Sequence, residues 1–571
     1  MTGDVYFPDA VPPDDVDVLV VGAGPVGLST AVELTSRGVG VAVVDAARAA
    51  LLVRAGAMGH SPRTVEHFHR WGLLQRIRDE WTFPPEWNHG IRLITSLAGH
   101  DLAPGRRHGF LDAAAPRHSL ARPIRRPQTA LQQVFLRHLE QHEVSVAGGW
   151  RVEALEQGED SVRTTVVHDT TGETRTVFSR YVVGADGGRS TVRTLSGIAR
   201  EGEHATEKHY RLVVRTQDVP DRLGPAPSGT NIVFNQQASG FLAAISPREW
   251  RVYSEPYPLD AEPTEDELLA TARAAFGFDL QLELASATTF YRATRIAETF
   301  RRGRVLLAGD AAHVRTPGGN LGEGFGDVAN LGWKLAAVLH GTAPDALLDS
   351  YDAERRPHNW RVADHALQRS RRTAETLAAI RRIGVPDDAD QGPDAVCRRA
   401  DISALLARAA GEAPGVIFDE RYDASPVIWY EAGQDAAERP WSADTYELDA
   451  RPGHRAPDGY LDPWGYTLYD RIGNDFALLV LAGDDTVARS FSTAAEGRGL
   501  ALTVIYLTDP RLRDLYGTDN VLVRPDQHVA WRGSVLPPAG AAGVLDVVLG
   551  QTAVPRSDAG DERRLTGSTA R

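Results

Sequence analysis

The stretch Asp17-Val-Leu-Val-Val-Gly-Ala-Gly-Pro-Val-Gly27 decides the fold of the first part of the chain. Its apolar, β-branched run ends at Gly22 and is typical of a buried parallel strand. The three glycines have the spacing Gly-x-Gly-x-x-Gly and lead into residues 28–37, whose apolar positions recur at helical spacing. A second apolar run, residues 39–44, ends at Asp45. A strand, a glycine turn, a helix, a strand and an acid in this order predict a dinucleotide-binding unit.

Each glycine of this motif has a separate task. Gly22 permits a tight turn, Gly24 lets the backbone approach a pyrophosphate, and Gly27 lets the helix pack closely on the strand. The pyrophosphate would lie at the helix N-terminus, where free N–H groups and the helix dipole favour an anion. Asp45 would accept hydrogen bonds from ribose hydroxyls. The motif alone does not distinguish NAD from FAD.

Two further segments place an acid where an apolar run ends. Residues 181–186 read Tyr-Val-Val-Gly-Ala-Asp, and residues 303–310 read Gly-Arg-Val-Leu-Leu-Ala-Gly-Asp. A glycine-rich stretch, residues 317–326, then leads into an expected helix over residues 327–340. An acid at a strand end can bind a ribose or ribitol hydroxyl, and a glycine-rich helix start can hold a phosphate or a developing flavin anion. Each segment alone could be an ordinary turn, but all three in this order indicate one nucleotide site.

Composition and charge limit the classes of partner. The chain has 571 residues, too many for one hydrophobic core, so two or three domains are expected. Its formal net charge of −14 disfavours nucleic acid and anionic membranes as partners. With Cys397 as the single cysteine, a disulfide, a CxxC redox pair and a cysteine-rich zinc site are excluded, which fits the cytoplasm. We expect no metal site, no signal peptide and no transmembrane helix.

The order of the three motifs resembles that of the group A, single-component FAD-dependent aromatic hydroxylases. The resemblance runs from about residue 16 to residue 356, and the segment Gly324-Phe-Gly-Asp-Val-Ala-Asn-Leu-Gly-Trp-Lys-Leu335 is very close to a helix start of that family. This family includes phenol, 3-(3-hydroxyphenyl)propionate and aromatic polyketide hydroxylases. The resemblance implies an α/β FAD-binding domain of the para-hydroxybenzoate-hydroxylase type.

The resemblance also implies which residues would hold FAD. They are Gly22, Gly24, Pro25, Val26, Gly27, Asp45, Arg54, Gln128, Asp186, Gly309, Asp310, Pro317, Asn320, Leu321 and Gly322. Among them, Arg54 would contact a phosphate, Gln128 would begin a helix beside the flavin, and Asp310 would meet the ribitol. Asp45 stands where the family usually has Glu. No catalytic side chain is implied, because the chemistry is centred on the flavin.

The loop from His313 to Asp327 departs from the family pattern. It is shorter than usual and lacks the Met-Asn pair of the family, whose loop lines the pyrimidine side of the flavin. We expect FAD binding to survive, because backbone N–H groups do most of that work. The position of the flavin, and hence its reactivity, is expected to differ.

An inserted substrate domain is expected over residues 199–282, between two parts of the FAD domain at residues 1–198 and 283–395. Its strand-like runs are separated by turn residues, as in an antiparallel sheet. Candidates for a substrate pocket are aromatic: Phe234, Phe241, Tyr253 and Tyr291, with Trp81, Phe83 and Trp87 from an earlier loop. Aromatic residues in a sheet are more often part of the core.

The last part, residues 396–571, resembles the thioredoxin-like C-terminal domain that longer family members carry. It has no cysteine pair, so dithiol chemistry is excluded. A structural or homodimer-forming role is the default interpretation. A polar tail is expected from about residue 555.

By this resemblance the chain is a monooxygenase that uses FAD, NAD(P)H and O2. NAD(P)H would reduce the flavin, O2 would form a C4a-hydroperoxyflavin, and one oxygen atom would pass to a phenolic or polyketide-type aromatic substrate. The middle of the chain has no second Gly-x-Gly-x-x-Gly motif, so NAD(P)H would bind without a domain of its own. Two alternatives stay open: Baeyer–Villiger oxidation or epoxidation of a polyketide-like substrate, and an FAD-binding protein without redox function.

Overall fold

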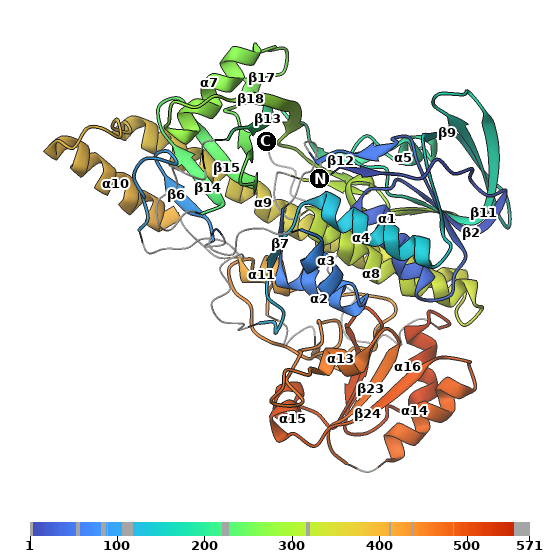
Figure 1. Ribbon diagram of the computed structural model, residues 1–571. Helices are drawn as coiled ribbons and strands as arrows, with labels where there is room; N and C mark the ends of the chain where they lie inside the picture. Colours follow the sequence, from blue (N-terminus) through green and yellow to red (C-terminus); the bar gives the residue numbers. More distant parts are fainter. Residues whose placement is uncertain are drawn as a thin grey trace, which may run out of the picture.

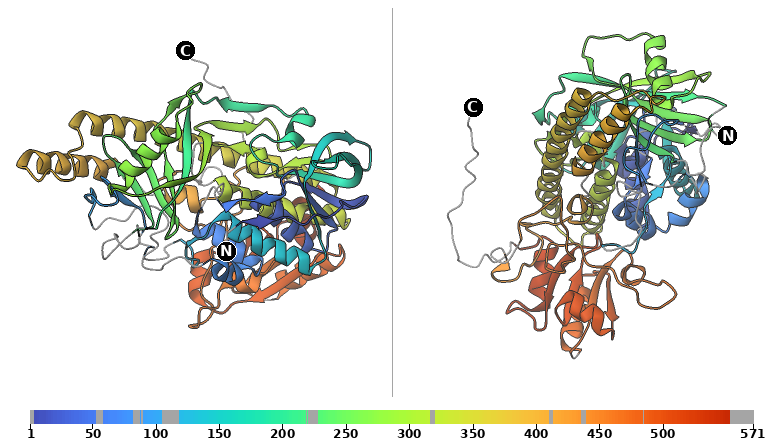
Figure 2. Two further views of the ribbon diagram at one scale, coloured as in Figure 1. Left: turned by 45° about the horizontal axis from the view of Figure 1, so that its top comes forward. Right: turned by 90° about the vertical axis from the view of Figure 1, so that its left-hand side faces the viewer.

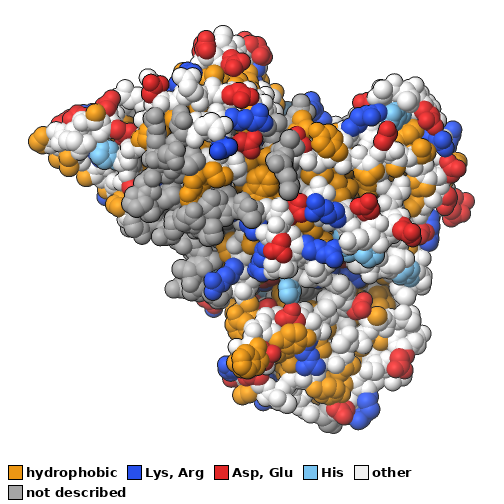
Figure 3. Space-filling model, in the orientation of Figure 1, with side chains coloured by type: hydrophobic (Ala, Val, Ile, Leu, Met, Phe, Trp, Pro, Cys, Tyr) orange, Lys and Arg blue, Asp and Glu red, His pale blue; other side chains and the backbone are white. Residues whose placement is uncertain are grey.

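The computed structural model describes residues 4–52, 58–81, 87, 90–104, 118–217, 219, 228–315, 320–409, 413–434, 439–483 and 485–552. In Figure 1 the first sheet and the inserted sheet (green) lie in the upper part, and a C-terminal unit (orange to red) lies below them. Charged side chains of both signs are interspersed over the face shown in Figure 3, so the negative net charge does not gather there. No helix in these ranges is long and apolar enough to cross a membrane.

The first sheet has the strand order β20-β21-β11-β2-β3-β8. Its five parallel strands are β2 (Asp15–Val21), β3 (Val41–Asp45), β8 (Ser145–Gly148), β11 (Thr174–Gly184) and β21 (Val305–Leu307). Antiparallel strands extend it: β9 (Trp150–Gln157), β10 (Val162–His168) and β20 (Arg301–Arg302). Val18, Val20 and Val21 of β2 and the valines of β3 are buried, as expected for parallel strands covered on both faces.

Three long helices pack beside this sheet (Figure 1): α1 (Pro25–Thr35), α4 (Gln128–Gln141) and α8 (Asn320–Leu339). Helices α1 and α8 approach so closely that a Cβ at Gly332 would lie 2.2 Å from the Cγ of Glu33. The shorter elements are β1 (Val5–Tyr6), β4 (Ala49–Ala50), β5 (Gly59–His60), β7 (Ile124–Arg125), β12 (Arg200–Glu203), β19 (Thr294–Ala297), β22 (His313–Val314), α2 (Pro62–Arg70), α3 (Leu74–Glu80), α5 (Thr191–Leu195) and α11 (Pro414–Phe418).

The inserted sheet has the order β17-β13-β16-β15-β14-β6, with β18 also paired to β13. Its strands are β6 (Arg92–Ile94), β13 (Glu207–Arg215), β14 (Thr230–Phe234), β15 (Ser239–Ser246), β16 (Glu249–Tyr253), β17 (Tyr257–Pro258) and β18 (Glu283–Tyr291). Helix α7 (Glu265–Phe276) covers one face, where Trp250 and Phe276 are fully buried. The sheet therefore extends beyond residues 199–282, because β6 joins from an earlier segment and β18 continues to residue 291.

Two helices run past the inserted sheet. Helix α9 (Asp349–Ile383) is followed by α10 (Pro393–Ala409), and Figure 2 shows them side by side. Residue 395, where the sequence places a domain boundary, lies inside α10. Ile380 of α9 and Ile402 of α10 share a hydrophobic cluster with Leu93 of β6. Helix α10 thus packs with the inserted sheet.

The C-terminal unit is a four-stranded mixed sheet of order β24-β23-β25-β26. Its elements are α13 (Leu468–Ile472), β23 (Phe476–Val480), α14 (Thr486–Glu496), β24 (Leu502–Tyr506), α15 (Pro510–Tyr516), β25 (Asn520–Val523), β26 (Val529–Gly533) and α16 (Gly540–Val548). Strands β23 and β24 are parallel and joined through α14, whereas β25 and β26 form an antiparallel hairpin. This arrangement is the expected thioredoxin-like fold.

Buried ion pairs join the C-terminal unit to the first domain. Arg455 donates to Glu66 of α2 at 2.7 Å, and Arg524 donates to Glu354 of α9 at 2.6 Å. Lys334 of α8 donates to the same Glu354 at 2.6 Å. All five side chains are at most 3% exposed. Because an unpaired buried charge is costly, these contacts hold the unit in one orientation.

Candidate cofactor and substrate site

All three sequence motifs meet at one edge of the first sheet. Val21 of β2 pairs with Gly184 of β11, and Gly184 in turn pairs with Leu307 of β21. The turns that follow these parallel strands therefore leave from the same carboxyl edge, beside the end of β3 at Asp45. In open α/β sheets, ligands bind at this edge.

The first turn leaves space for a ligand only at its middle glycine. Gly22 has φ +112°, and a Cβ there would lie 2.4 Å from the carbonyl oxygen of Ala185. A Cβ at Gly27 would lie 1.8 Å from the carbonyl oxygen of Gly22. At Gly24, directly before α1, a Cβ would meet nothing within 4 Å. This open space at a helix N-terminus fits the pyrophosphate of a dinucleotide.

Asp45 stabilises this turn. Its Oδ2 accepts a hydrogen bond from the Ala23 N–H at 2.6 Å, and its Oδ1 accepts one from Ala47 at 2.7 Å. Burial raises the pKa of Asp45 and the negative charge of Asp186 adds to this, although the two backbone hydrogen bonds act in the opposite direction. Asp45 and Asp186 therefore flank the same site, with lone pairs left on each Asp45 oxygen for a ribose hydroxyl.

Asp186 presents an oxygen that fits a ligand hydroxyl. Its Oδ2 accepts a hydrogen bond from the Val192 N–H at 3.0 Å. Its Oδ1 is buried and has no hydrogen-bond partner in the described part of the chain. A buried carboxylate oxygen without a donor is rare in folded proteins, so a bound hydroxyl or amine is the expected partner. Arg200 links this turn to the third motif by donating to the carbonyls of Gly188 and Asp310.

Hydrogen bonds to the side chain of Asp327 hold the Gly-Asp turn, residues 309–310, in place. The Oδ2 of Asp327 accepts a hydrogen bond from the Gly309 N–H at 3.0 Å and lies 2.7 Å from His313 Nε2. Arg355 donates to its other oxygen at 2.8 Å. Asp310 is thereby held with its side chain open to solvent. The surrounding protein still raises the pKa of Asp310, because it excludes much of the water that would solvate the carboxylate.

The start of α8 completes the site. A Cβ at Gly309 would lie 3.0 Å from Cγ2 of Val26, and one at Gly324 would lie 2.6 Å from the same atom. The Gly-Asp turn and α8 therefore both pack on the first turn of α1. Helix α8 begins at Asn320, so Asn320, Leu321 and Gly322 stand beside this junction.

The remaining candidates for FAD binding have different outcomes. Arg54 and Pro317 lie outside the described residues. Gln128 is the first residue of α4, as expected. The glutamine that reaches the first turn is Gln132, whose Nε2 donates to the Ala23 carbonyl at 2.9 Å. The sequence signal for Gln132 was its position four residues after Gln128, because residues four apart lie on the same face of a helix.

A row of four rings crosses the inserted sheet. The ring centroids of Phe241 and Tyr253 lie 5.3 Å apart, those of Tyr253 and Phe290 4.9 Å apart, and those of Phe290 and His209 5.1 Å apart. The four residues come from strands β15, β16, β18 and β13. The same sheet face carries Val213 and Ile245, which pack against Leu52 and Met58 of the first domain. The row thus faces the nucleotide-binding part.

The other aromatic candidates lie elsewhere. Tyr291 is 49% exposed and points to the opposite face of β18 from Phe290, because successive side chains of a strand alternate. Phe234 is buried in the cluster formed with α9 and α10. Trp87 contacts Trp250 on the face covered by α7, at a centroid distance of 5.8 Å. Trp81 packs at the edge of the Leu52 cluster, and Phe83 lies outside the described residues.

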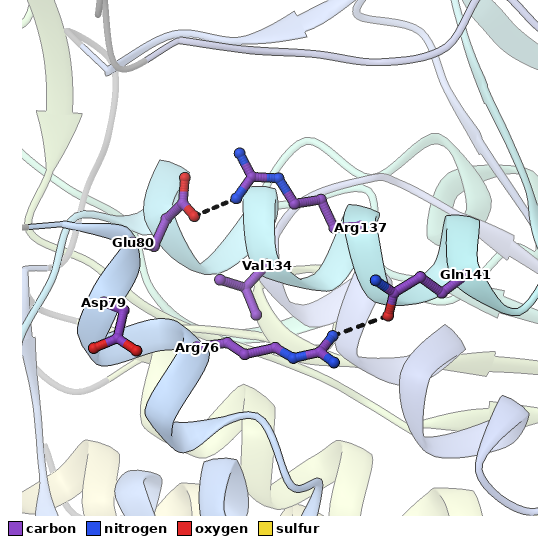
Figure 4. A pocket seen from close by; sticks show the side chains of 6 residues that line it. All are labelled: Arg76, Asp79, Glu80, Val134, Arg137 and Gln141. Atoms are coloured by element: carbon purple, nitrogen blue, oxygen red, sulfur yellow. Dashed lines mark hydrogen bonds and ion pairs between the residues drawn. The ribbon is translucent and has the colours of Figure 1, made fainter.

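A groove between α3 and α4 takes no part in this arrangement (Figure 4). It is lined by Arg76, Asp79, Glu80, Val134, Arg137 and Gln141. Arg137 donates to Glu80, and Arg76 donates to Gln141 at 2.9 Å. Both of its arginines are thus engaged by neighbouring side chains, and none of its lining residues belongs to the three motifs.

Comparison with known proteins agrees with this site. Residues 15–366 match the family described as FAD binding domain, and residues 449–552 match the C-terminal region of aromatic-ring hydroxylases. The chain is 31% identical to 4-methyl-5-nitrocatechol 5-monooxygenase of a Burkholderia species, over 95% of this chain and 98% of that protein. It is also 31% identical to tetracenomycin A2 monooxygenase-dioxygenase of Streptomyces glaucescens, over 93% of this chain and 96% of that protein.

A solved structure has the same architecture. RebC with bound 7-carboxy-K252c is similar with a TM-score of 0.84 and 31% identity, covering 95% of this chain and all of that one. The expected family, fold and cofactor are confirmed by these matches together. The chain belongs to the FAD-dependent aromatic-ring hydroxylases, a family of monooxygenases.

Proposed function

We propose that this chain hydroxylates a flat phenolic or polyketide-type aromatic compound, using NAD(P)H and O2. The observation that carries the substrate class is the row of four rings on the face of the inserted sheet that meets the first domain. Rings with centroids about 5 Å apart offer a broad apolar wall on which another ring can pack. A related chain, 4-methyl-5-nitrocatechol 5-monooxygenase, is named for a catechol, which is a phenolic compound.

We also propose which residues bind FAD, and the geometry at the sheet edge supports this proposal. We assign this role to Gly22, Gly24, Pro25, Val26, Gly27, Asp45, Gln128, Gln132, Asp186, Gly309, Asp310, Asn320, Leu321 and Gly322, and to Arg54 and Pro317 from the sequence alone. When bound, FAD supplies electron transfer from NAD(P)H and activation of O2. The open space at Gly24 fits the pyrophosphate, and the unpartnered Oδ1 of Asp186 fits a hydroxyl.

The side chains of the protein bind and orient the substrate and exclude water. Phe241, Tyr253 and Phe290 are half-buried, so their ring faces can be covered by a ligand. His209 is buried and stacks on Phe290 with an interplanar angle of 17°, which fixes the end of the row. A dry, shaped surface favours transfer of oxygen to the substrate over its loss as hydrogen peroxide.

A direct assay tests this proposal. The purified protein is denatured to release FAD, and the oxidation of NADPH and NADH is followed with a panel of phenols and polycyclic quinonoid compounds. We expect at least one polycyclic compound to stimulate NAD(P)H oxidation and to gain one ring hydroxyl. A product that is a lactone or an epoxide would assign the alternative oxidation to the same site. No stimulation across the panel would contradict the substrate class.

Two further expectations from the sequence remain proposals. We place the enzyme in the cytoplasm, because its single cysteine does not require an oxidising compartment. We also propose that it forms a homodimer through the C-terminal unit. Light scattering of the full-length chain, coupled to gel filtration, measures the mass directly, and a monomer would refute the second proposal.

A further inference from the structure

Arg315 is a buried arginine between the Gly-Asp turn and the start of α8. Its side chain is 2% exposed. Its Nε donates to Oδ1 of Asn320 at 2.8 Å, which fixes the guanidinium against the first residue of α8. Its Nη1 is buried and has no hydrogen-bond partner among the residues that the structure describes. A buried N–H without an acceptor is costly, so a bound group is the expected partner.

The charge of Arg315 is only partly neutralised by protein. Within the described part of the chain, its ion pair is with Glu323, at 3.5 Å between Nη2 and Oε1. Glu323 has closer contacts elsewhere, because its Oε2 lies 2.8 Å from His358 Nε2 and 3.1 Å from Arg355 Nη2. Burial lowers the pKa of Arg315. The positive charge of Arg315 also acts on Asp310 of the Gly-Asp turn, where it favours the ionised carboxylate. The guanidinium therefore sits where a further negative group would be favoured.

We propose that Arg315 is a cofactor-binding residue that donates its Nη1–H to the pyrimidine half of the flavin and favours the reduced ring. This rests on the proposed placement of FAD, with Asp310 at the ribitol and residues 320–322 beside the ring. Arg315 lies between these two places. Bound FAD would gain negative charge on its pyrimidine half when NAD(P)H reduces it, and the fixed, buried guanidinium of Arg315 would stabilise such charge. The N-terminus of α8 contributes in the same direction.

Three variants of the full-length protein separate charge from packing. Arg315→Gln keeps an amide donor for Asn320 but removes the positive charge. Arg315→Lys keeps the charge on a side chain without the planar fork. Arg361→Gln is the matched control, because Arg361 of α9 is also largely buried but donates to Asp423 at 2.6 Å and to the Arg421 carbonyl.

The readouts are the two-electron midpoint potential of bound FAD, its dissociation constant, and the affinity of the oxidised flavin for sulfite. Sulfite adds to the flavin and leaves the same negative charge as reduction does. We expect Arg315→Gln to weaken sulfite binding at least tenfold and to lower the midpoint potential by about 30 mV, the equivalent of a tenfold change for two electrons. Arg315→Lys should lie between this variant and the wild type, and Arg361→Gln should match the wild type.

One pattern would overturn the proposal. If Arg315→Gln binds FAD more weakly but keeps the potential and the sulfite affinity, Arg315 merely braces the start of α8. If Arg315→Gln holds too little FAD to titrate, Arg315→Lys decides: a potential below that of the wild type but with FAD retained supports the proposal, and an unchanged potential opposes it. A wild-type protein that binds no FAD would refute the cofactor site itself, which is a separate failure.

Discussion

Replacing Glu420 with glutamine removes the charge that holds two buried arginines together. Glu420 is 7% exposed, and its Oε2 accepts a hydrogen bond from Arg63 Nε at 2.8 Å, while its Oε1 accepts one from Arg355. Arg63 belongs to α2 and also donates to Gln527 of the C-terminal unit at 2.6 Å. Glutamine has nearly the same shape but leaves both guanidinium groups without this carboxylate.

The expected cost follows from the partners that remain. Breaking a buried ion pair by removing one partner typically costs about 3–5 kcal/mol. Arg63 retains Glu66 at 3.1 Å, and Arg355 retains Asp327 at 2.8 Å, so we expect the lower end of that range, about 3 kcal/mol. The assay is urea unfolding of the full-length protein at pH 7, followed by tryptophan fluorescence and by release of FAD.

The contribution of Glu420 to the free energy of unfolding depends on pH. Although burial raises the pKa of Glu420, Arg63 and Arg355 hold it well below its usual value. Its stabilising contribution is therefore complete above the pKa of an unfolded glutamate and is lost as the pH falls below it. Glu420→Gln should consequently lose less stability on acidification than the wild type does.

A control in the same connecting segment separates this effect from a general loss of charge. Glu431 pairs with Arg532 at 2.6 Å, but its side chain is 38% exposed. Glu431→Gln should change the free energy of unfolding by less than about 1 kcal/mol, because exposed pairs contribute little. If Glu420→Gln unfolds at the same urea concentration as Glu431→Gln, the reasoning about the buried network is refuted.

Four other substitutions test single features of the site and its support. Gly24→Ala should leave the urea midpoint of the FAD-free protein unchanged but weaken FAD binding at least tenfold, because the new methyl occupies space kept for the cofactor. Gly27→Ala should unfold more readily, because its Cβ would lie 1.8 Å from a carbonyl oxygen. Glu33→Gln should destabilise the fold by about 3 kcal/mol at pH 7, since Arg70 and other donors overcome burial and lower the Glu33 pKa to about 2; that contribution should fade between pH 4.5 and 2, and an unaltered acid-unfolding curve would oppose it. Tyr253→Ala should raise the KM for the aromatic substrate and increase hydrogen peroxide release per NAD(P)H; full coupling in this variant would separate the ring row from catalysis.

The sequence was sufficient for features that depend on local patterns. Glycine spacing and strand-ending acids at Gly22, Asp45, Asp186 and Asp310 placed the nucleotide site, since parallel strands carry their following turns to one sheet edge. The thioredoxin-like unit was likewise recognisable from its resemblance to the C-terminal domain of longer family members.

Features that depend on register and long-range pairing were not predictable in the same way. Phe290 rather than Tyr291 lies in the ring row, and the choice between two neighbouring aromatic residues is fixed by the pairing of β18 with β13. Strand β6 joins a sheet whose other strands lie more than a hundred residues further along the chain. The partners of Glu420 come from α2 and α9, and no local spacing connects them.

The central claim is that this FAD-dependent monooxygenase places oxygen from O2 on an aromatic ring bound against the row of Phe241, Tyr253, Phe290 and His209. It is tested most directly by turnover under oxygen-18 gas with the polycyclic compound that best stimulates NAD(P)H oxidation. We predict one oxygen-18 atom in a new ring hydroxyl, formed in proportion to the NAD(P)H consumed. A product that contains oxygen only from water, or NAD(P)H consumption that yields hydrogen peroxide and no labelled product, would contradict the account.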